Sequence, residues 1–328
     1  MKREVNNRKV AIIGCGFVGA TTAFALMESG LFSEMALIDV DRDRAEGEAL
    51  DISHGLAFAS PMEIHAGTYD DVENASVVIV TAGAAQKPGE TRIDLVNKNV
   101  AIYKGIIAEI KKRGCKGILL VVSNPVDVLT QVTIQLSGLP QNRVIGSGTV
   151  LDSGRLKQII SERLDVDPRN VHVGVLGEHG DSELIAWSGA HVAGIPLEDF
   201  FNMRSKGSYE EFRTEVTDEV RNSAYEIIDK KKATYFGIAM AIRRICACIV
   251  RDEKSVLPVS TMMQGEYGID GVALSTPCVL GKNGIEVRMS PSLNYLEQSQ
   301  LQASAATLKE IVAGLDLGTS PEQKAAKE

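Results

Sequence analysis

The sequence lacks the features of several large classes of protein. None of its apolar runs is long enough to span a bilayer, and residues 1–8 lack the apolar core of a signal peptide. Positive charge is not in excess, since the 328 residues carry a formal net charge of -8 and a pI near 5.3. An acidic surface does not attract nucleic acid or an anionic membrane. We therefore expect a cytoplasmic protein with neither as a partner.

Cysteine is scarce as well. The five cysteines are an odd number scattered along the chain, at Cys15, Cys115, Cys246, Cys248 and Cys278. This distribution fits buried reduced thiols better than a disulfide framework. Cys246 and Cys248 suggest a metal site, but side chains two apart on a helix point to different sides. The sequence predicts no bound metal, and it contains no internal repeat.

What the sequence does contain begins with a strand, a glycine turn and a helix. The apolar run 9–13 leads into Gly14, Gly16 and Gly19, spaced as G-x-G-x-x-G, before the helical pattern 20–29. The spacing alone is weak evidence. Between a strand and a helix, however, such glycines let the backbone approach a pyrophosphate at the helix N-terminus.

An acidic residue stands at the expected distance from this turn. The apolar run 35–38 ends at Asp39, where a Rossmann unit places the carboxylate that binds the adenosine ribose. A carboxylate there accepts hydrogen bonds from both ribose hydroxyls and repels a 2'-phosphate, so NAD is favoured over NADP. Arg42 and Arg44 soften that preference.

Alternating patterns predict an α/β fold in two parts. Helices at 44–52 and 93–112 alternate with strands at 63–66, 77–80 and 118–122, which indicates a parallel, doubly wound sheet. The pattern of the second part predicts a mixed α+β domain. Its helices are expected at 150–164 and 209–250, with a last helix opened by Ser290 and Pro291. Its strands are expected at 171–176 and, as an antiparallel set, at 256–263, 271–280 and 285–289. We expect a dinucleotide-binding domain at 1–148, a substrate domain at 149–317 and a disordered tail at 318–328.

Polar residues follow the predicted strands and open the next helix. The loop 81–92 is either an ordinary connection or a lid that closes over cofactor, and Asn124 precedes a proline at another strand end. Thr149 and Asp152 have the spacing of a capping box. Asp152 and Arg155 form either a plain ion pair or an acid and an arginine on one functional face.

His179 lies in the polar run 177–181 after an apolar segment. A histidine titrates near neutral pH, so at the end of a strand it can donate and accept protons. The alternative is a loop histidine paired with nearby carboxylates for structural reasons only.

Taken in order, these motifs resemble the lactate and malate dehydrogenase family, from about residue 9 to residue 315. The likeness is to its bacterial L-lactate branch, because Gln86 stands where malate dehydrogenases usually carry an arginine and Lys232–Tyr235 resembles the lactate-type helix. The resemblance implies hydride transfer between NADH and pyruvate, with malate or a bulkier 2-hydroxy acid as rival substrates. A non-catalytic NAD-binding protein is the alternative of another class.

The resemblance also implies roles for individual residues. His179 is the proton donor and acceptor, supported by Asp152, while Arg92 polarises the substrate carbonyl. Substrate contacts fall on Gln86, Arg92, Asn124, Arg155 and Thr234. Contacts with NAD fall on Gly14, Gly16, Val18, Gly19, Asp39, Arg44, Tyr69, Gly83, Ala84, Gly105, Val122, Ser123 and Asn124.

The last implications concern assembly. Members of the family are commonly homotetramers, and Lys157 and His172 match positions that bind fructose 1,6-bisphosphate in many bacterial members. Those members usually have arginine at the first position, where this chain has lysine.

Overall fold

A parallel sheet forms the first half of the molecule. In the computed structural model, which describes residues 4–84 and 91–315 apart from the side chain of Arg92, its strands have the spatial order β3-β2-β1-β4-β5-β6. They are β1 (Asn6–Ile13), β2 (Glu34–Ile38), β3 (Glu63–Ala66), β4 (Ala75–Val80), β5 (Ile118–Val121) and β6 (Val144–Gly146). This is the strand order of a Rossmann fold, as predicted.

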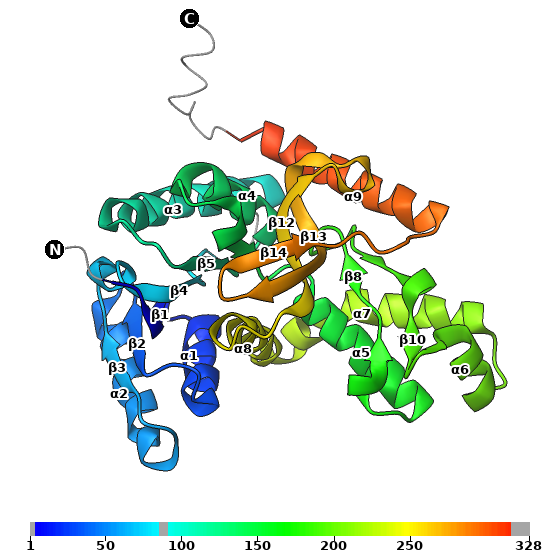
Figure 1. Ribbon diagram of the computed structural model, residues 1–328, viewed down its shortest axis with the longest axis horizontal. Coiled ribbons are helices and arrows are strands. Elements are labelled where there is room, and N and C mark those ends of the chain that lie inside the picture. Colours follow the sequence, from blue (N-terminus) through cyan, green and yellow to red (C-terminus); the bar gives the residue numbers. More distant parts are fainter. Residues whose placement is uncertain (1–3, 85–90, 316–328) are drawn as a thin grey trace, which may run out of the picture.

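Helices cover both faces of this sheet (Figure 1). α3 (Arg92–Arg113) and α4 (Val126–Ser137) lie on one face, and α1 (Phe17–Ser29) and α2 (Arg42–His54) on the other. α9 (Tyr295–Ala313) packs beside α4, and α8 (Phe236–Val250) packs beside α1. The alternation of side chains along β1 explains this, since Ala11 and Ile13 face the first layer and Val10 and Ile12 the second. Where both faces are buried the strands are apolar, as in β5 and the second half of β1.

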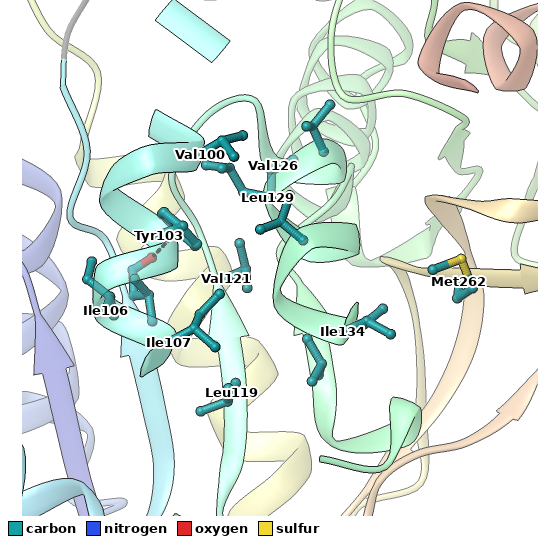
Figure 2. Packing of buried hydrophobic residues seen from close by; sticks show 14 of the residues in the cluster. Val100, Tyr103, Ile106, Ile107, Leu119, Val121, Val126, Leu129, Ile134 and Met262 are labelled. Atoms are coloured by element: carbon teal, nitrogen blue, oxygen red, sulfur yellow. Dashed lines mark hydrogen bonds between the residues drawn. The ribbon is translucent and has the colours of Figure 1, made fainter. Parts of the chain in front are cut away.

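The first layer is tightly packed around α3 and α4. Figure 2 shows side chains of α3, β5 and α4 meeting in one cluster, among them Val100, Tyr103, Ile106, Ile107, Leu119, Val121, Val126, Leu129 and Ile134. Tyr103 is fully buried, and its hydroxyl donates to the carbonyl of Val80 at 3.2 Å. This bond ties α3 to the end of β4, where the predicted ligand loop begins.

Three antiparallel strands extend the same sheet to nine strands. β12 (Ser255–Gln264) pairs with β6 at Ser260 and Gly146, and is followed by β13 (Asp270–Gly281) and β14 (Gly284–Arg288). The predicted antiparallel strands are confirmed, and they join the parallel sheet.

A third cluster of buried side chains holds the remaining elements together. They are α5 (Val150–Leu164), β7 (Val171–His172), β8 (Val175–Leu176), β9 (Leu184–Ile185), β10 (His191–Val192), α6 (Leu197–Arg204) and α7 (Tyr209–Lys231). β11 (Ile195–Pro196) pairs antiparallel with β10. Among the described residues, no helix has both the length and the apolar character that a membrane span requires.

Three predicted element bounds were wrong. The helix predicted at 209–250 is two helices, because Lys232 adopts a left-handed conformation with φ of 69° that ends α7. The strand predicted at 171–176 is divided between β7 and β8. The last helix begins at Tyr295 and is capped by Asn294 rather than Ser290, because Asn294 and Glu297 form a capping box. The predicted tail, 318–328, lies outside the described residues.

Thr149 does not form the capping box that its spacing with Asp152 suggested. Its hydroxyl donates to the carbonyl of Val175 at 2.5 Å, and its side chain makes no cap hydrogen bond. Asp152 is thereby left to other partners.

Candidate active site

A cavity of about 1080 Å³ opens at the carboxyl ends of the parallel strands. Eight residues predicted to contact NAD line it: Gly14, Gly16, Asp39, Arg44, Tyr69, Gly83, Ala84 and Gly105. Four others, Val18, Gly19, Val122 and Ser123, are described but lie outside this lining. Asn124 lines the neighbouring cavity that contains His179.

The glycine turn has the close backbone packing that a dinucleotide requires. A Cβ atom on Gly14, whose φ is 101°, would lie 2.6 Å from the amide nitrogen of Ala82, and one on Gly19 would lie 1.8 Å from the carbonyl oxygen of Gly14. A Cβ on Gly16 would meet nothing within 4 Å. Gly14 and Gly19 thus bring β1, α1 and the end of β4 together, while Gly16 leaves open space at the start of α1.

Asp39 is held in place by two backbone amides. Its carboxylate accepts hydrogen bonds from the N–H of Cys15 at 2.6 Å and the N–H of Asp41 at 2.9 Å. Each carboxylate oxygen has two lone pairs, so both oxygens can still accept a ribose hydroxyl. The site therefore fits the adenosine half of NAD.

The second cavity, of about 380 Å³, brings together four predicted residues: Asn124, Asp152, Arg155 and His179. Asp152 lies at the start of α5 and is 3% exposed. The Nδ1 atom of His179 lies 2.6 Å from Oδ2 of Asp152, and Arg155 donates from Nη1 to Oδ1 of Asp152, also at 2.6 Å. The predicted ion pair of Asp152 and Arg155 is present, and both side chains line the same cavity as His179.

The contact between His179 and Asp152 controls their protonation. Burial by itself lowers the pKa of His179, but the Asp152 carboxylate outweighs it and raises that pKa to about 9. Burial by itself raises the pKa of Asp152. The neighbouring cations of His179 and Arg155 outweigh burial and hold that pKa below its usual range. The pair is therefore an imidazolium and a carboxylate at neutral pH.

The loop that carries His179 is held by Asp127, a residue that the sequence analysis did not predict as part of the site. Asp127, on α4 and 2% exposed, accepts the backbone N–H of His179 at 2.8 Å and the hydroxyl of Ser260 at 2.5 Å. Asn99 of α3 plays a similar part at the strand ends, since its amide contacts the backbone of Ala84 and the carbonyl of Asn124.

Sequence reasoning also missed one wall of the His179 cavity. α7 contributes Arg221, Ala224, Tyr225 and Ile228, and Glu183 comes from the His179 loop itself. The α7 positions recur at three- and four-residue spacing, which marks one face of a helix.

Three predicted substrate contacts stand apart from these. Thr234 is half-buried in the segment between α7 and α8. It is not among the residues that line the His179 cavity. Gln86 lies outside the described residues. Arg92 opens α3, and its side chain lies outside the described part as well.

Among the residues that the structure describes, two groups of side chains have the composition of a metal site. Glu34, His65 and Asp71 form one, but Nζ of Lys9 lies 2.7 Å from Glu34 and 3.0 Å from Asp71 and already supplies a cation. The other is Asp152, His179 and Glu183, where the imidazolium of His179 and the guanidinium of Arg155 supply the positive charge.

Comparison with known proteins places this geometry in a family. Residues 8–146 match the lactate/malate dehydrogenase NAD binding domain, and residues 149–315 match the lactate/malate dehydrogenase α/β C-terminal domain. The chain belongs to the lactate/malate dehydrogenase family. It is 50% identical over 309 residues to an L-lactate dehydrogenase of Thermoanaerobacter sp., covering 94% of this chain and 99% of the relative. It is 48% identical over 304 residues to L-lactate dehydrogenase 1 of Clostridium acetobutylicum, covering 93% and 97%.

Solved structures of lactate dehydrogenases share the whole architecture. The minor L-lactate dehydrogenase of Enterococcus mundtii, in its ligands-bound form, superposes with a TM-score of 0.92 at 43% identity, covering 95% of this chain and 99% of that one. A lactate dehydrogenase from a Medee basin deep-sea metagenome library also gives 0.92, at 46% identity, covering 94% and 99%.

The two residues that the lactate dehydrogenase resemblance linked to regulation lie in a third cavity, of about 740 Å³. Lys157 and His172 line it together with His191 and Arg244. His172 of β7 lies opposite His191 of β10, with ring centroids 4.8 Å apart. Burial lowers the pKa of Lys157, and burial together with the charges of His191 and Lys157 lowers that of His172.

Proposed function

We propose that this chain is an NAD-dependent L-lactate dehydrogenase that interconverts pyruvate and L-lactate, with His179 as the proton donor and acceptor. The observation that carries the proposal is the contact of His179 with Asp152 beside Arg155, in one cavity next to the NAD cavity. The similarity to L-lactate dehydrogenases along nearly the whole chain supports the same function.

NAD fits the residues that line the larger cavity. Gly14 and Gly16 allow the pyrophosphate to approach the start of α1, and Asp39 accepts the ribose hydroxyls. When bound, NAD supplies the chemistry of hydride transfer at its nicotinamide ring. The carboxylate of Asp39 also disfavours a 2'-phosphate, which supports NAD rather than NADP.

The substrate carboxylate is held by Arg155 in this proposal. The guanidinium has five N–H donors and uses Nη1 on Asp152, so several remain for a bidentate contact with a carboxylate. Asn124, which lines the same cavity, offers the bound substrate a neutral hydrogen-bonding amide. Thr234 is proposed to complete the cradle from the α7–α8 segment.

His179 then moves one proton. During reduction, negative charge grows on the ketone oxygen, and protonated His179 donates to it from the ring nitrogen that Asp152 does not hold. During oxidation, the neutral ring accepts the proton of the lactate hydroxyl. Asp152 orients the ring for both directions and stabilises its charged form.

The loop residues provide polarisation and selectivity in this proposal. Arg92 polarises the carbonyl when the loop closes and helps to exclude water. Gln86 is neutral and suits the methyl end of pyruvate, whereas a second carboxylate needs a cation there. Both roles rest on the family resemblance.

Assembly, regulation and location follow as further parts of the proposal. We infer a homotetramer in which fructose 1,6-bisphosphate binds near Lys157 and His172, supported by the cations and histidines gathered in that cavity. The five buried free thiols suit a reducing compartment, which supports the cytoplasm.

One experiment tests the central claim. NADH oxidation is followed with pyruvate, oxaloacetate and 2-ketoisocaproate in parallel, and we expect the highest kcat/KM with pyruvate. A preference for oxaloacetate or for the branched acid would assign another substrate. No turnover with any of them, in protein that binds NADH, would leave a cofactor-binding role only.

A further inference from the structure

A second acid lies beside the His179–Asp152 pair. Glu183 ends the His179 loop directly before β9 and is 6% exposed. Its carboxylate, a ring nitrogen of His179 and the carboxylate of Asp152 lie within 4.8 Å of one another, and Glu183 lines the substrate cavity. The proton transfer described above gives this buried acid no role.

The charged groups around Glu183 come from four segments. Asp152 and Arg155 belong to α5, Asp127 to α4, Arg221 to α7, and His179 and Asp181 to the loop itself. Tyr225 of α7 lies at the same cavity and donates its hydroxyl to Asp181. The two arginines and His179 favour an ionised Glu183, while Asp152 opposes it.

Burial and like charge keep Glu183 neutral. Burial raises its pKa, the Asp152 carboxylate raises it further, and the result is about 8. Two carboxyl groups this close, both nearly buried, cannot both ionise easily. Since Asp152 is paired with both His179 and Arg155, Glu183 keeps the proton at neutral pH.

This protonation state decides the charge that the substrate meets. With Glu183 neutral, three cations line the cavity, Arg155, Arg221 and protonated His179, and they exceed the two carboxylates of Asp152 and Asp181 by one charge. A 2-keto acid brings one negative charge and meets an opposite charge. Ionised Glu183 would cancel that excess and add a repulsion close to the bound carboxylate.

We propose that Glu183 determines the affinity of the cavity for its anionic substrate, binding being strong with the neutral acid and weak with the carboxylate. The proposal rests on the lactate dehydrogenase function proposed above and makes Glu183 a specificity-determining residue for that reaction. When only the protonated fraction binds well, the apparent affinity falls in proportion to that fraction.

The test compares the pyruvate KM of the parent enzyme and Glu183→Gln between about pH 7 and pH 9. In the parent, we expect the KM to rise ~10-fold over this interval, because ~10% of Glu183 stays protonated at the upper end. In Glu183→Gln, whose amide keeps the size and cannot ionise, the KM should rise by about threefold at most. The NADH KM should stay flat in both, since Glu183 is not part of the NAD cavity.

Asp181→Asn is the matched control. It removes an exposed carboxylate from the same cavity, so the pyruvate KM at any one pH can differ from that of the parent. The rise of the KM with pH should remain. A flat KM in the parent, or an equal rise in Glu183→Gln, overturns the proposal. If Glu183→Gln does not fold, Glu183→Ala replaces it under the same criteria. A parent without pyruvate turnover at any pH would instead overturn the proposed function.

Discussion

The carboxylate of Asp127 accepts the backbone N–H of His179 at 2.8 Å, so α4 fixes the loop that carries the proposed proton donor. We expect Asp127→Ala to lower kcat ~10- to 100-fold, because a displaced donor loses alignment with the carbonyl. The buried N–H also loses its partner, which costs about 1–3 kcal/mol of folding free energy. Asp127→Asn keeps an acceptor oxygen and should recover most of both losses. Steady-state kinetics and urea unfolding measure them, and equal defects in the two variants would exclude the hydrogen bond as the cause.

Replacement of the proton donor should separate chemistry from binding. We expect His179→Gln to lower kcat for pyruvate reduction ~10²- to 10⁴-fold, because general acid catalysis is lost while the NAD cavity is untouched. NADH titration followed by fluorescence should give a Kd within about threefold of the parent. Undiminished turnover would contradict the role of His179.

The two reaction directions should depend on pH with opposite sign. The pKa of His179 is raised to about 9 by Asp152 against the effect of burial, so the imidazolium that donates a proton is present below that pH. At saturating substrate, kcat for pyruvate reduction should therefore fall as the pH rises through about 9, and kcat for lactate oxidation should rise over the same interval. Parallel profiles measured in one mixed buffer provide the test. A common direction for both would mean that another step limits the rate.

Substrate choice should follow the charge at position 86. We expect Gln86→Arg to shift the ratio of kcat/KM for oxaloacetate over pyruvate ~100-fold or more, since a second carboxylate needs a cation in a water-excluded site. Gln86→Met is the matched control, because it has similar length and no charge. A ratio within about threefold of the parent in the arginine variant would show that another residue recognises the side chain.

Regulation should depend on the cavity that contains Lys157 and His172. Burial and neighbouring cations lower the pKa of His172, so its positive charge is present only in acid. A sugar bisphosphate favours the charged form, and activation should be stronger near pH 6 than near pH 8. The pyruvate KM is measured at both pH values with and without millimolar fructose 1,6-bisphosphate. His172→Gln should remove the pH dependence of the effect, and no change in the parent KM at either pH would exclude this site.

The sequence predicted those elements whose pattern is local. Strand β3 and helix α5 have the predicted bounds, because alternation and helical periodicity are visible over a few residues. The end of α7 at Lys232 was missed because a lysine in the left-handed conformation follows two other lysines, with no glycine or proline to mark it. The predicted start of α9 was wrong although the sequence carries the signal, since Asn294 and Glu297 have the spacing of a capping box.

The site was predicted where residues stand at strand ends or helix starts. His179, Asp152 and Arg155 belong to that class and meet in one cavity. Asp127 also stands at a helix start, in the first turn of α4, but its significance, like that of Glu183, comes from burial beside His179, and burial of a carboxylate depends on segments far away in the chain. No pattern in the sequence distinguishes them from solvated acids.

The pairing of β12 with β6 also has a consequence for folding during synthesis. The contact joins Gly146 to Ser260, so a long stretch of chain must be in place before the edge of β6 is covered. Until then the unpaired N–H and C=O groups of that edge are available to strands of other molecules. The fragment of residues 1–148 would keep this edge open permanently and is therefore a candidate for aggregation. We therefore expect a segment that is synthesised more than a hundred residues after β6 to protect the first part of the chain from self-association.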